Sequence, residues 1–264
     1  MEFFDSHSHY NDEKFDEDRD EIIIKTKEEG ITKWICAGYD INSSKLSVKI
    51  AEKYPFIYSI CGISPNDVPE KIEEIEGMIK DIEQLIQNDK NNRIVAIGEI
   101  GLDYYWNKEN KEIQQEIFKK QIDLANKYNI PIVIHTREAV MDTIEILKNN
   151  NVNKRGIFHC CPLNRELVKE ALKMDYYISF AGPITFKNSK NAKEIVEMVP
   201  LNRILIETDS PYLSPEPQRG IRNDSRKVKF VAEKIAEFKE ITLEEVAKQT
   251  YKNALEVFNK ISKK

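Results

Sequence analysis

Short β-rich runs that alternate with longer amphipathic stretches limit the fold of this chain more than any other feature. Runs rich in Ile, Val, Phe and Tyr recur eight times in 264 residues, each before a polar or glycine-containing turn and a stretch with helical spacing. Such alternation is typical of parallel strands joined by crossover helices. The runs are residues 3–4, 31–37, 56–63, 94–100, 130–134, 156–158, 176–180 and 204–206.

Helical periodicity between the runs supports the same interpretation. Isoleucines at 72, 75, 79, 82 and 86 form one apolar stripe, and residues 113–125 form a second that ends near Asn129. Thr242 and Glu245 predict a capping box for a last helix. Eight such units predict an α/β fold, a (β/α)8 TIM barrel with a parallel eight-stranded core and a C-terminal helix. An open doubly wound sheet is the alternative.

Composition predicts a single folded domain over residues 1–264, because 41% of the residues are hydrophobic and no linker or fixed-period repeat interrupts them. No basic segment precedes an apolar run at the N-terminus, so we expect an unprocessed cytoplasmic protein with no membrane segment. Four cysteines without CxxC spacing fit reduced, packed thiols. The net charge of −5 argues against a dominant basic surface, although a local anion site is compatible with it. No obligate protein partner is evident.

All four histidines fall at the ends of predicted strands. His7 and His9 follow the first apolar run with the spacing that places two side chains on one side of a strand. His135 follows "IPIVI" and His159 follows "GIF". An isolated His-x-His also fits a polar N-terminal loop, but the C-terminal ends of barrel strands are where active sites form. The four together therefore predict a metal site.

Two carboxylates complete this pattern. Glu99 lies in "RIVAIGEIGLD" and Asp209 follows "RILIET", both in apolar surroundings where a carboxylate needs a partner such as a cation. Taken singly, each also fits a helix cap or a salt bridge. With the histidines they give six ligands for two divalent ions about 3.5–4 Å apart. Zn²⁺, Mn²⁺ and Mg²⁺ are the candidates, and the sequence does not choose among them.

Several motifs together resemble the TatD family of metal-dependent deoxyribonucleases, within the amidohydrolase-like barrel group, over essentially the whole chain. They are "DSHSH" (5–9), "AIGEIGLDYY" (96–105), "PIVIHTREA" (131–139), "FHC" (158–160) and "ETDSPYLSPEP" (207–217), in the family's order. The resemblance implies that His7 and His9 bind one metal and that His135 and His159 bind a second. It also implies that Glu99 bridges the two metals.

In the same family pattern, Asp209 binds the first metal and handles a proton, so that Glu99 and Asp209 are the catalytic carboxylates. The resemblance further implies a 3′-5′ exodeoxyribonuclease that uses a metal-activated water and prefers single-stranded DNA. Charge, composition and spacing do not themselves show this substrate.

Four further residues are candidate substrate contacts. Arg137 can offer a planar fork of donors to a phosphate, or it can cap a helix start. Asp103 can position substrate or hold a loop. Where family members commonly read Gly-x-His-Pro-His, this chain has Gly-Ile-Ser-Pro-Asn at 62–66. Ser64 and Asn66 can still donate hydrogen bonds to phosphate, and Asn66 also fits a plain turn.

Other functions stay open at this level. The same ligands on the same barrel can hydrolyse another ester or amide, such as D-aminoacyl-tRNA or a small phosphoester, because pocket shape chooses the electrophile. A metal-binding barrel without activity is a third hypothesis, and the loss of both loop histidines is its only support. The sequence "YYW" at 104–106, which closely follows Glu99, fits either base stacking or an aromatic cluster that closes the barrel end.

Overall fold

Eight parallel strands form the centre of the molecule in the computed structural model, which describes residues 1–261. Neighbours in the sheet are neighbours in the sequence, from β1 to β8. Backbone bonds from Asp209 N to His7 O (3.0 Å) and from His9 N to Ser210 O (2.7 Å) join the segment after β8 back to β1. The strands are β1 (Phe3–Ser8), β2 (Ile31–Ala37), β3 (Ile57–Cys61), β4 (Ile94–Asp103), β5 (Ile132–Arg137), β6 (Ile157–Phe158), β7 (Tyr177–Phe180) and β8 (Ile204–Ile206).

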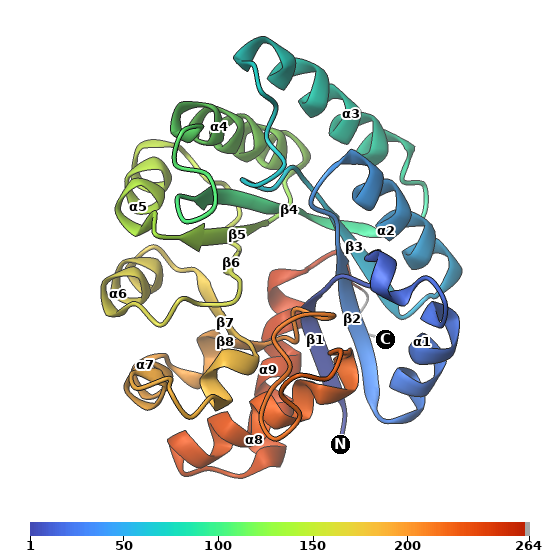
Figure 1. Ribbon diagram of the computed structural model, residues 1–264, viewed down its shortest axis with the longest axis vertical. Coiled ribbons are helices and arrows are strands. Elements are labelled where there is room, and N and C mark those ends of the chain that lie inside the picture. Colours follow the sequence, from blue (N-terminus) through green and yellow to red (C-terminus); the bar gives the residue numbers. More distant parts are fainter. Residues whose placement is uncertain (262–264) are drawn as a thin grey trace.

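Helices surround this ring of strands (Figure 1). They are α1 (Arg19–Glu28), α2 (Ile41–Lys53), α3 (Ile75–Asn88), α4 (Lys111–Tyr128), α5 (Val140–Asn149), α6 (Arg165–Lys173), α7 (Ala192–Met198), α8 (Val228–Lys239) and α9 (Leu243–Val257). Short 3-10 turns are η1 (Glu13–Phe15), η2 (Ile72–Glu74), η3 (Gly182–Thr185), η4 (Leu201–Arg203) and η5 (Ser225–Lys227). The arrangement is the predicted (β/α)8 barrel, and it excludes the open doubly wound sheet.

The predicted helix signals are confirmed with one exception. Helix α9 begins with the Thr242–Glu245 capping box, and α4 ends at Asn129, whose left-handed φ of 51° closes the helix. The exception is the first isoleucine of the 72–86 stripe. Ile72 is 49% exposed because it lies in the 3-10 turn η2, which precedes α3 and breaks the helical period.

Alternate residues of the strands face two different cores, because side chains on a strand alternate between its faces. The inner face carries Val133, Ile157 and Leu205, which pack with the C-terminal part of α9. Phe4 stacks on Phe258 there, with ring centroids 6.2 Å apart, so α9 helps close one end of the barrel. The outer faces pack against the surrounding helices.

The candidate functional side chains continue the inward-facing side of the strands beyond the inner core. Because side chains alternate along a strand, the inward-facing Val133 is followed two residues later by His135, and Ile157 by His159. In the same way Leu205 is followed by Glu207 and Asp209.

Among residues 1–261, none of the helices is both long enough and apolar enough to span a bilayer.

Candidate metal centre

His7, His9 and Asp209 form the first group of converging donor atoms. The Nε2 atoms of His7 and His9 are 3.2 Å apart, and Asp209 Oδ1 lies 3.2 Å from His9 Nε2 and 3.9 Å from His7 Nε2. The donor atoms of this trio all lie within 4.8 Å of one another. Strand β1 and the segment after β8 supply them, and the backbone bonds between these segments fix their separation.

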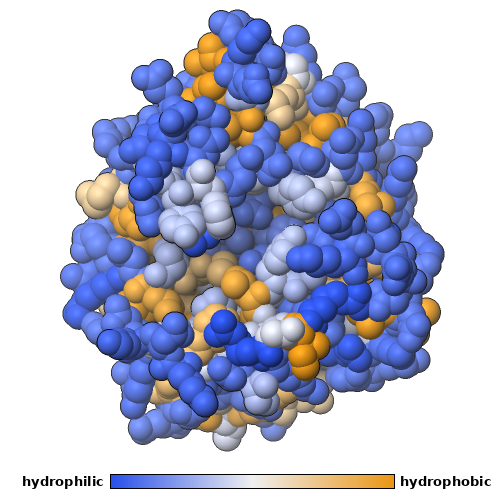
Figure 2. Space-filling view, in the orientation of Figure 1, coloured by the Kyte–Doolittle hydropathy of each residue, from blue (hydrophilic) through white to orange (hydrophobic). Residues whose placement is uncertain are grey.

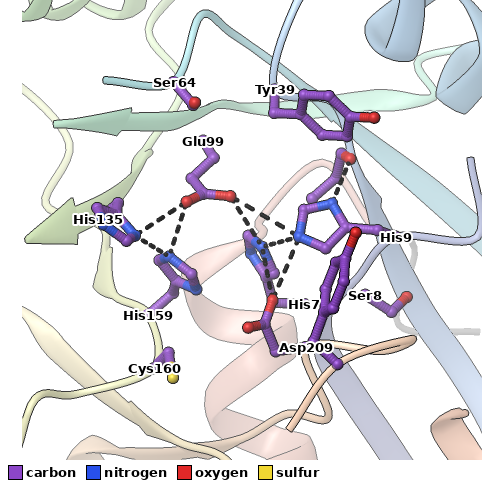
Figure 3. Close-up of polar contacts among 12 residues, drawn as sticks. His7, Ser8, His9, Tyr39, Ser64, Glu99, His135, His159, Cys160 and Asp209 are labelled. Carbon is purple, nitrogen blue, oxygen red and sulfur yellow. Dashed lines mark hydrogen bonds and ion pairs between the residues drawn. The ribbon is translucent and has the colours of Figure 1, made fainter. Parts of the chain in front are cut away.

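His135, His159 and Glu99 form the second group. Glu99 Oε1 lies 3.0 Å from His135 Nδ1 and 3.2 Å from His159 Nε2, and the two imidazole nitrogens are 3.3 Å apart. The other oxygen, Oε2, lies 3.5 Å from His7 Nε2 and 3.8 Å from His9 Nε2. Figure 3 shows Glu99 between the two pairs of histidines, with one oxygen turned to each pair.

These distances fit ligands around a metal ion. A tetrahedral Zn²⁺ with nitrogen ligands at about 2.0–2.1 Å requires ligand atoms about 3.3 Å apart. The nitrogen pairs of both groups, at 3.2 and 3.3 Å, meet this requirement. Neutral imidazoles present a lone pair for coordination, so a cation at each point of convergence satisfies all the donors at once.

The charge balance of the cluster also favours cations. Burial acts to raise the pKa of Glu99, but the surrounding histidines, His159 first, outweigh it and hold this pKa well below its usual range. In the same way, burial lowers the pKa of His159, but Glu99 and Glu207 raise it well above its ordinary value. Glu99 therefore carries its negative charge at neutral pH, and the site needs protons or metal ions to balance it.

The pKa of Asp209 is set by the same balance between burial and neighbouring histidines. Burial raises the pKa of Asp209, yet the hydrogen bond with His9 and the positive potential of the other histidines give a net lowering. Asp209 is therefore ionised, and its side chain is the most exposed of the three in the first group. Its backbone has a left-handed φ of 55°, a conformation that Asp tolerates better than most residues.

Two further carboxylates, those of Asp103 and Glu207, lie near the ring nitrogens of His135 and His159 that do not face Glu99. Asp103 Oδ2 lies 2.9 Å from His135 Nε2; because an ionised Asp103 only accepts hydrogen bonds, a neutral His135 that offers Nδ1 to a metal would carry its proton on Nε2. Glu207 Oε1 lies 3.4 Å from His159 Nδ1 and accepts a hydrogen bond from the backbone of Cys160 at 2.7 Å. Glu207 was missed as a functional residue. Its spacing of two from Asp209 and from Leu205 was the available signal.

Comparisons with known proteins agree with this geometry. The profile of the family described as TatD related DNase matches residues 4–259. The chain belongs to the TatD family. It is 43% identical over 256 residues to the uncharacterized metal-dependent hydrolase YabD of Bacillus subtilis, covering 97% of this chain and 98% of that protein. The uncharacterized metal-dependent hydrolase YcfH of Escherichia coli K12 is 34% identical over 265 residues, covering 98% of this chain and 96% of that protein.

Solved structures agree on the fold. The TatD homologue YjjV from Escherichia coli K12 superposes with a TM-score of 0.89, covers 97% of this chain and 98% of its own, and shares 23% sequence identity. Together with the relatives, it establishes this chain as a TatD-family metal-dependent hydrolase with a TIM barrel.

The predicted substrate contacts of this TatD-family chain lie in different surroundings. Arg137 ends β5, two residues after His135, and its guanidinium carbon stacks 3.8 Å from the ring centroid of Tyr105. Asp103 is buried, and its oxygens bind His135 and two backbone N–H groups. We therefore interpret Asp103 as a positioning residue for His135, and its predicted contact with substrate stays a prediction.

The altered loop after β3 is held by its own hydrogen bonds. Ser64 Oγ donates to Asp67 Oδ2 at 2.5 Å and accepts from Asn66 N at 3.2 Å, so this hydroxyl serves a turn. Asn66 Nδ2 extends toward Asp103 Oδ2 at 3.5 Å. Figure 3 shows Ser64 on the far side of Glu99 from Asp209. These contacts give the Ser64 hydroxyl a role in the turn, whereas the Asn66 amide faces Asp103, and phosphate binding by either residue stays a prediction.

Proposed function

We propose that this chain is a phosphodiester hydrolase that removes nucleotides from the 3′ end of single-stranded DNA. The observation that carries the proposal is the sharing of Glu99 between two groups of converging donors, one oxygen to each. Such paired sites, with ions about 3.5–4 Å apart, are recurrent in phosphatases and nucleases. In this proposal residues 1–264 act as one catalytic domain.

The residues divide into two ligand sets. His7, His9 and Asp209 would hold one divalent ion, His135 and His159 the other, and Glu99 both. Bound ions of this kind lower the pKa of a water and neutralise charge on a phosphate. Zn²⁺ and Mn²⁺ suit the mixed nitrogen and oxygen donors, and Mg²⁺ is the third ion to test.

In this proposal Asp209 accepts the proton of the attacking water. Oδ1 faces His9 at 3.2 Å, which leaves Oδ2 to accept a proton. The lowered pKa of Asp209 keeps this carboxylate ionised before the reaction. Arg137 presents donors at the rim of the site, where a planar fork matches two phosphate oxygens.

A second candidate is hydrolysis of an ester that carries an ammonium group, such as D-aminoacyl-tRNA. A hollow of about 430 Å³ lies beside the centre and is lined by Asp12, Glu13, Asp16 and Asp40. Tyr39, which also lines it, packs edge-on against His9 with centroids 5.7 Å apart. Carboxylates attract an ammonium group and repel phosphate, so this hollow suits an aminoacyl ester better than it suits a long polyanion.

Turnover of end-labelled DNA tests the first proposal. Metal-stripped protein is given Mg²⁺, Mn²⁺ or Zn²⁺ and incubated with 3′-labelled or 5′-labelled single strands, in parallel with Glu99→Gln. We expect metal-dependent loss of the 3′ label first, with turnover by Glu99→Gln reduced at least 1000-fold, since removal of catalytic groups costs effects of this order. Glu74→Gln on the exposed turn η2 is the matched control. Cleavage of aminoacyl esters but not of DNA would support the second candidate instead.

A further inference from the structure

Two exposed aromatic side chains stand at the rim of the site beside the second donor group. Trp106 is 68% exposed and Tyr105 is 47% exposed, although large aromatic side chains are normally mostly buried. Their rings meet edge to face, with centroids 4.9 Å apart at 86°. Arg137 covers Tyr105, so Trp106 keeps the more open face. We call these three residues the aromatic rim.

The aromatic rim is fixed to the metal centre by one carboxylate. Asp103 Oδ1 accepts the backbone N–H groups of Tyr105 at 2.9 Å and of Trp106 at 3.0 Å, while its other oxygen holds His135. Gln114 donates to the backbone carbonyls of Asp103 at 3.1 Å and of Asn107 at 2.9 Å. The rim is therefore held at a defined place relative to the reacting phosphate of the proposed reaction.

Arg137 contributes an available positive charge. Within residues 1–261 its guanidinium forms no ion pair, and its recorded side-chain contacts are the rings of Tyr105 and Trp106. Stacking uses the face of a guanidinium and leaves its N–H edge to donate to phosphate. An aromatic face beside such an edge matches one nucleotide, with a base to stack and a phosphate to bind.

The side of the site next to the first donor group carries negative charge, whereas the aromatic rim carries the positive charge of Arg137. Among residues 1–261, the hollow beside His9 is lined by four carboxylates and by no lysine or arginine. Arg19 pairs with Asp16 nearby, and Lys14 lies 4.2 Å from the Tyr212 ring centroid, so the negative charge there is reduced but not cancelled. A DNA strand that continued over this rim would bring its phosphates toward those carboxylates.

We propose that the strand leaves the metal centre over the aromatic rim, and that the base on the 5′ side of the scissile phosphate stacks on Trp106. The terminal nucleoside, which carries no phosphate at its 3′ end, then lies toward the acidic hollow. This inference rests on the proposed 3′ exonuclease function and adds the direction of the strand to it. Figure 2 shows this face of the molecule hollowed near its middle, with side chains of intermediate hydropathy along the border.

A double-mutant cycle between protein and substrate tests the inference. Trp106→Ala is assayed for kcat/KM on three strands: one intact, one with an abasic tetrahydrofuran residue at the penultimate position, and one with it at the terminal position. On the intact strand we expect a loss of about 5- to 150-fold, the range of base–aromatic stacking. On the penultimate abasic strand the variant and the wild type should agree within twofold. On the terminal abasic strand the full loss should persist.

Ile221→Ala is the matched control, because Ile221 is an equally exposed apolar residue (62%) in the segment after β8. It should show no coupling to either abasic position, and thermal melts should show both variants folded. An unchanged Trp106 effect on the penultimate abasic strand would overturn the inference, and so would coupling to the terminal position alone. If the wild type degrades no DNA, the proposed function fails and the inference fails with it.

Discussion

Replacement of Asp103 by Asn should disable one half of the metal centre through the tautomer of a histidine. The pKa of Asp103 is lowered, since its hydrogen bond with His135 outweighs the opposing effect of burial, so this carboxylate only accepts hydrogen bonds. Asn can keep the backbone bonds of Tyr105 and Trp106 only by turning its oxygen to them. Its NH₂ group then faces His135 Nε2 and requires that nitrogen to be an acceptor.

The proton of His135 would then move to Nδ1, the atom that lies 3.0 Å from Glu99 and faces the second group. A protonated ring nitrogen cannot bind a metal. Loss of such a carboxylate partner typically costs 10- to 100-fold in metal affinity, about 1.4–2.8 kcal/mol. The donors of the first group do not contact Asp103, so affinity there should change by less than about threefold, within the usual limit for additive effects.

Asp103→Ala is the informative comparison. Alanine has no NH₂ group that would require His135 Nε2 to be an acceptor. The His135 side chain is 21% exposed, so its Nε2–H group can donate a hydrogen bond to water instead. We therefore expect Asp103→Asn to bind the second metal more weakly than Asp103→Ala does. Chelator competition measures both affinities, and nitrogen NMR of the imidazole reports the tautomer. Wild-type affinity in Asp103→Asn, or weaker binding by the alanine variant, would refute the tautomer argument.

Three further perturbations have defined outcomes. Chelation should lower Tm by about 5–10 °C for each ion that had been present at 100 times its Kd, because each such ion contributes about 2.7 kcal/mol; an unchanged melt would contradict metal binding to the folded state. Arg137→Lys keeps the charge but loses the stacked plane, so KM for DNA should rise about tenfold with kcat little changed in steady-state assays. Asp224, bonded to Arg226 at 2.8 and 3.1 Å, has a lowered pKa because that arginine outweighs burial. Asp224→Asn should cost about 1–3 kcal/mol at pH 7 in urea titrations. The stabilising effect of this carboxylate is fully present above the unfolded pKa, so the difference should begin to shrink as the pH falls below about 4 and be lost only below the lowered folded pKa.

The fold and the positions of the donors were predictable because both depend on local periodicity. Apolar runs marked all eight strands. Because side chains alternate along a strand, His135 lies on the same inner face as Val133, and His159 on the same inner face as Ile157. Strand β4 is the instructive exception. It continues past the predicted end at residue 100 to Asp103, and its register with β5 is irregular between Ile97 and Ile100, the stretch that contains Glu99.

The partners of the histidines were less predictable because they depend on register between strands. Asp103 reaches His135 because β4 and β5 pair Gly101 with His135 and Asp103 with Arg137, and no spacing within either strand encodes this pairing. The same pairing explains why one carboxylate serves both the metal centre and the aromatic rim. Asp103 is the last residue of β4, so its side chain reaches the neighbouring strand while it accepts N–H groups from its own following loop.

In the proposed function, the residues that would hold the metals differ from those that would guide the substrate. The proposed donors lie on β1, β4 and β5 or within a few residues after β1, β6 and β8. Two of the rim residues, Asp12 and Trp106, lie on the segments after β1 and β4 and are not proposed ligands. A TatD-family relative with a basic residue at the position of Asp12, and without an aromatic residue at that of Trp106, should therefore keep the metal chemistry while accepting the strand in the other direction. Exchange of these two segments between such proteins, followed by end-label assays, would test whether the rims alone decide the direction.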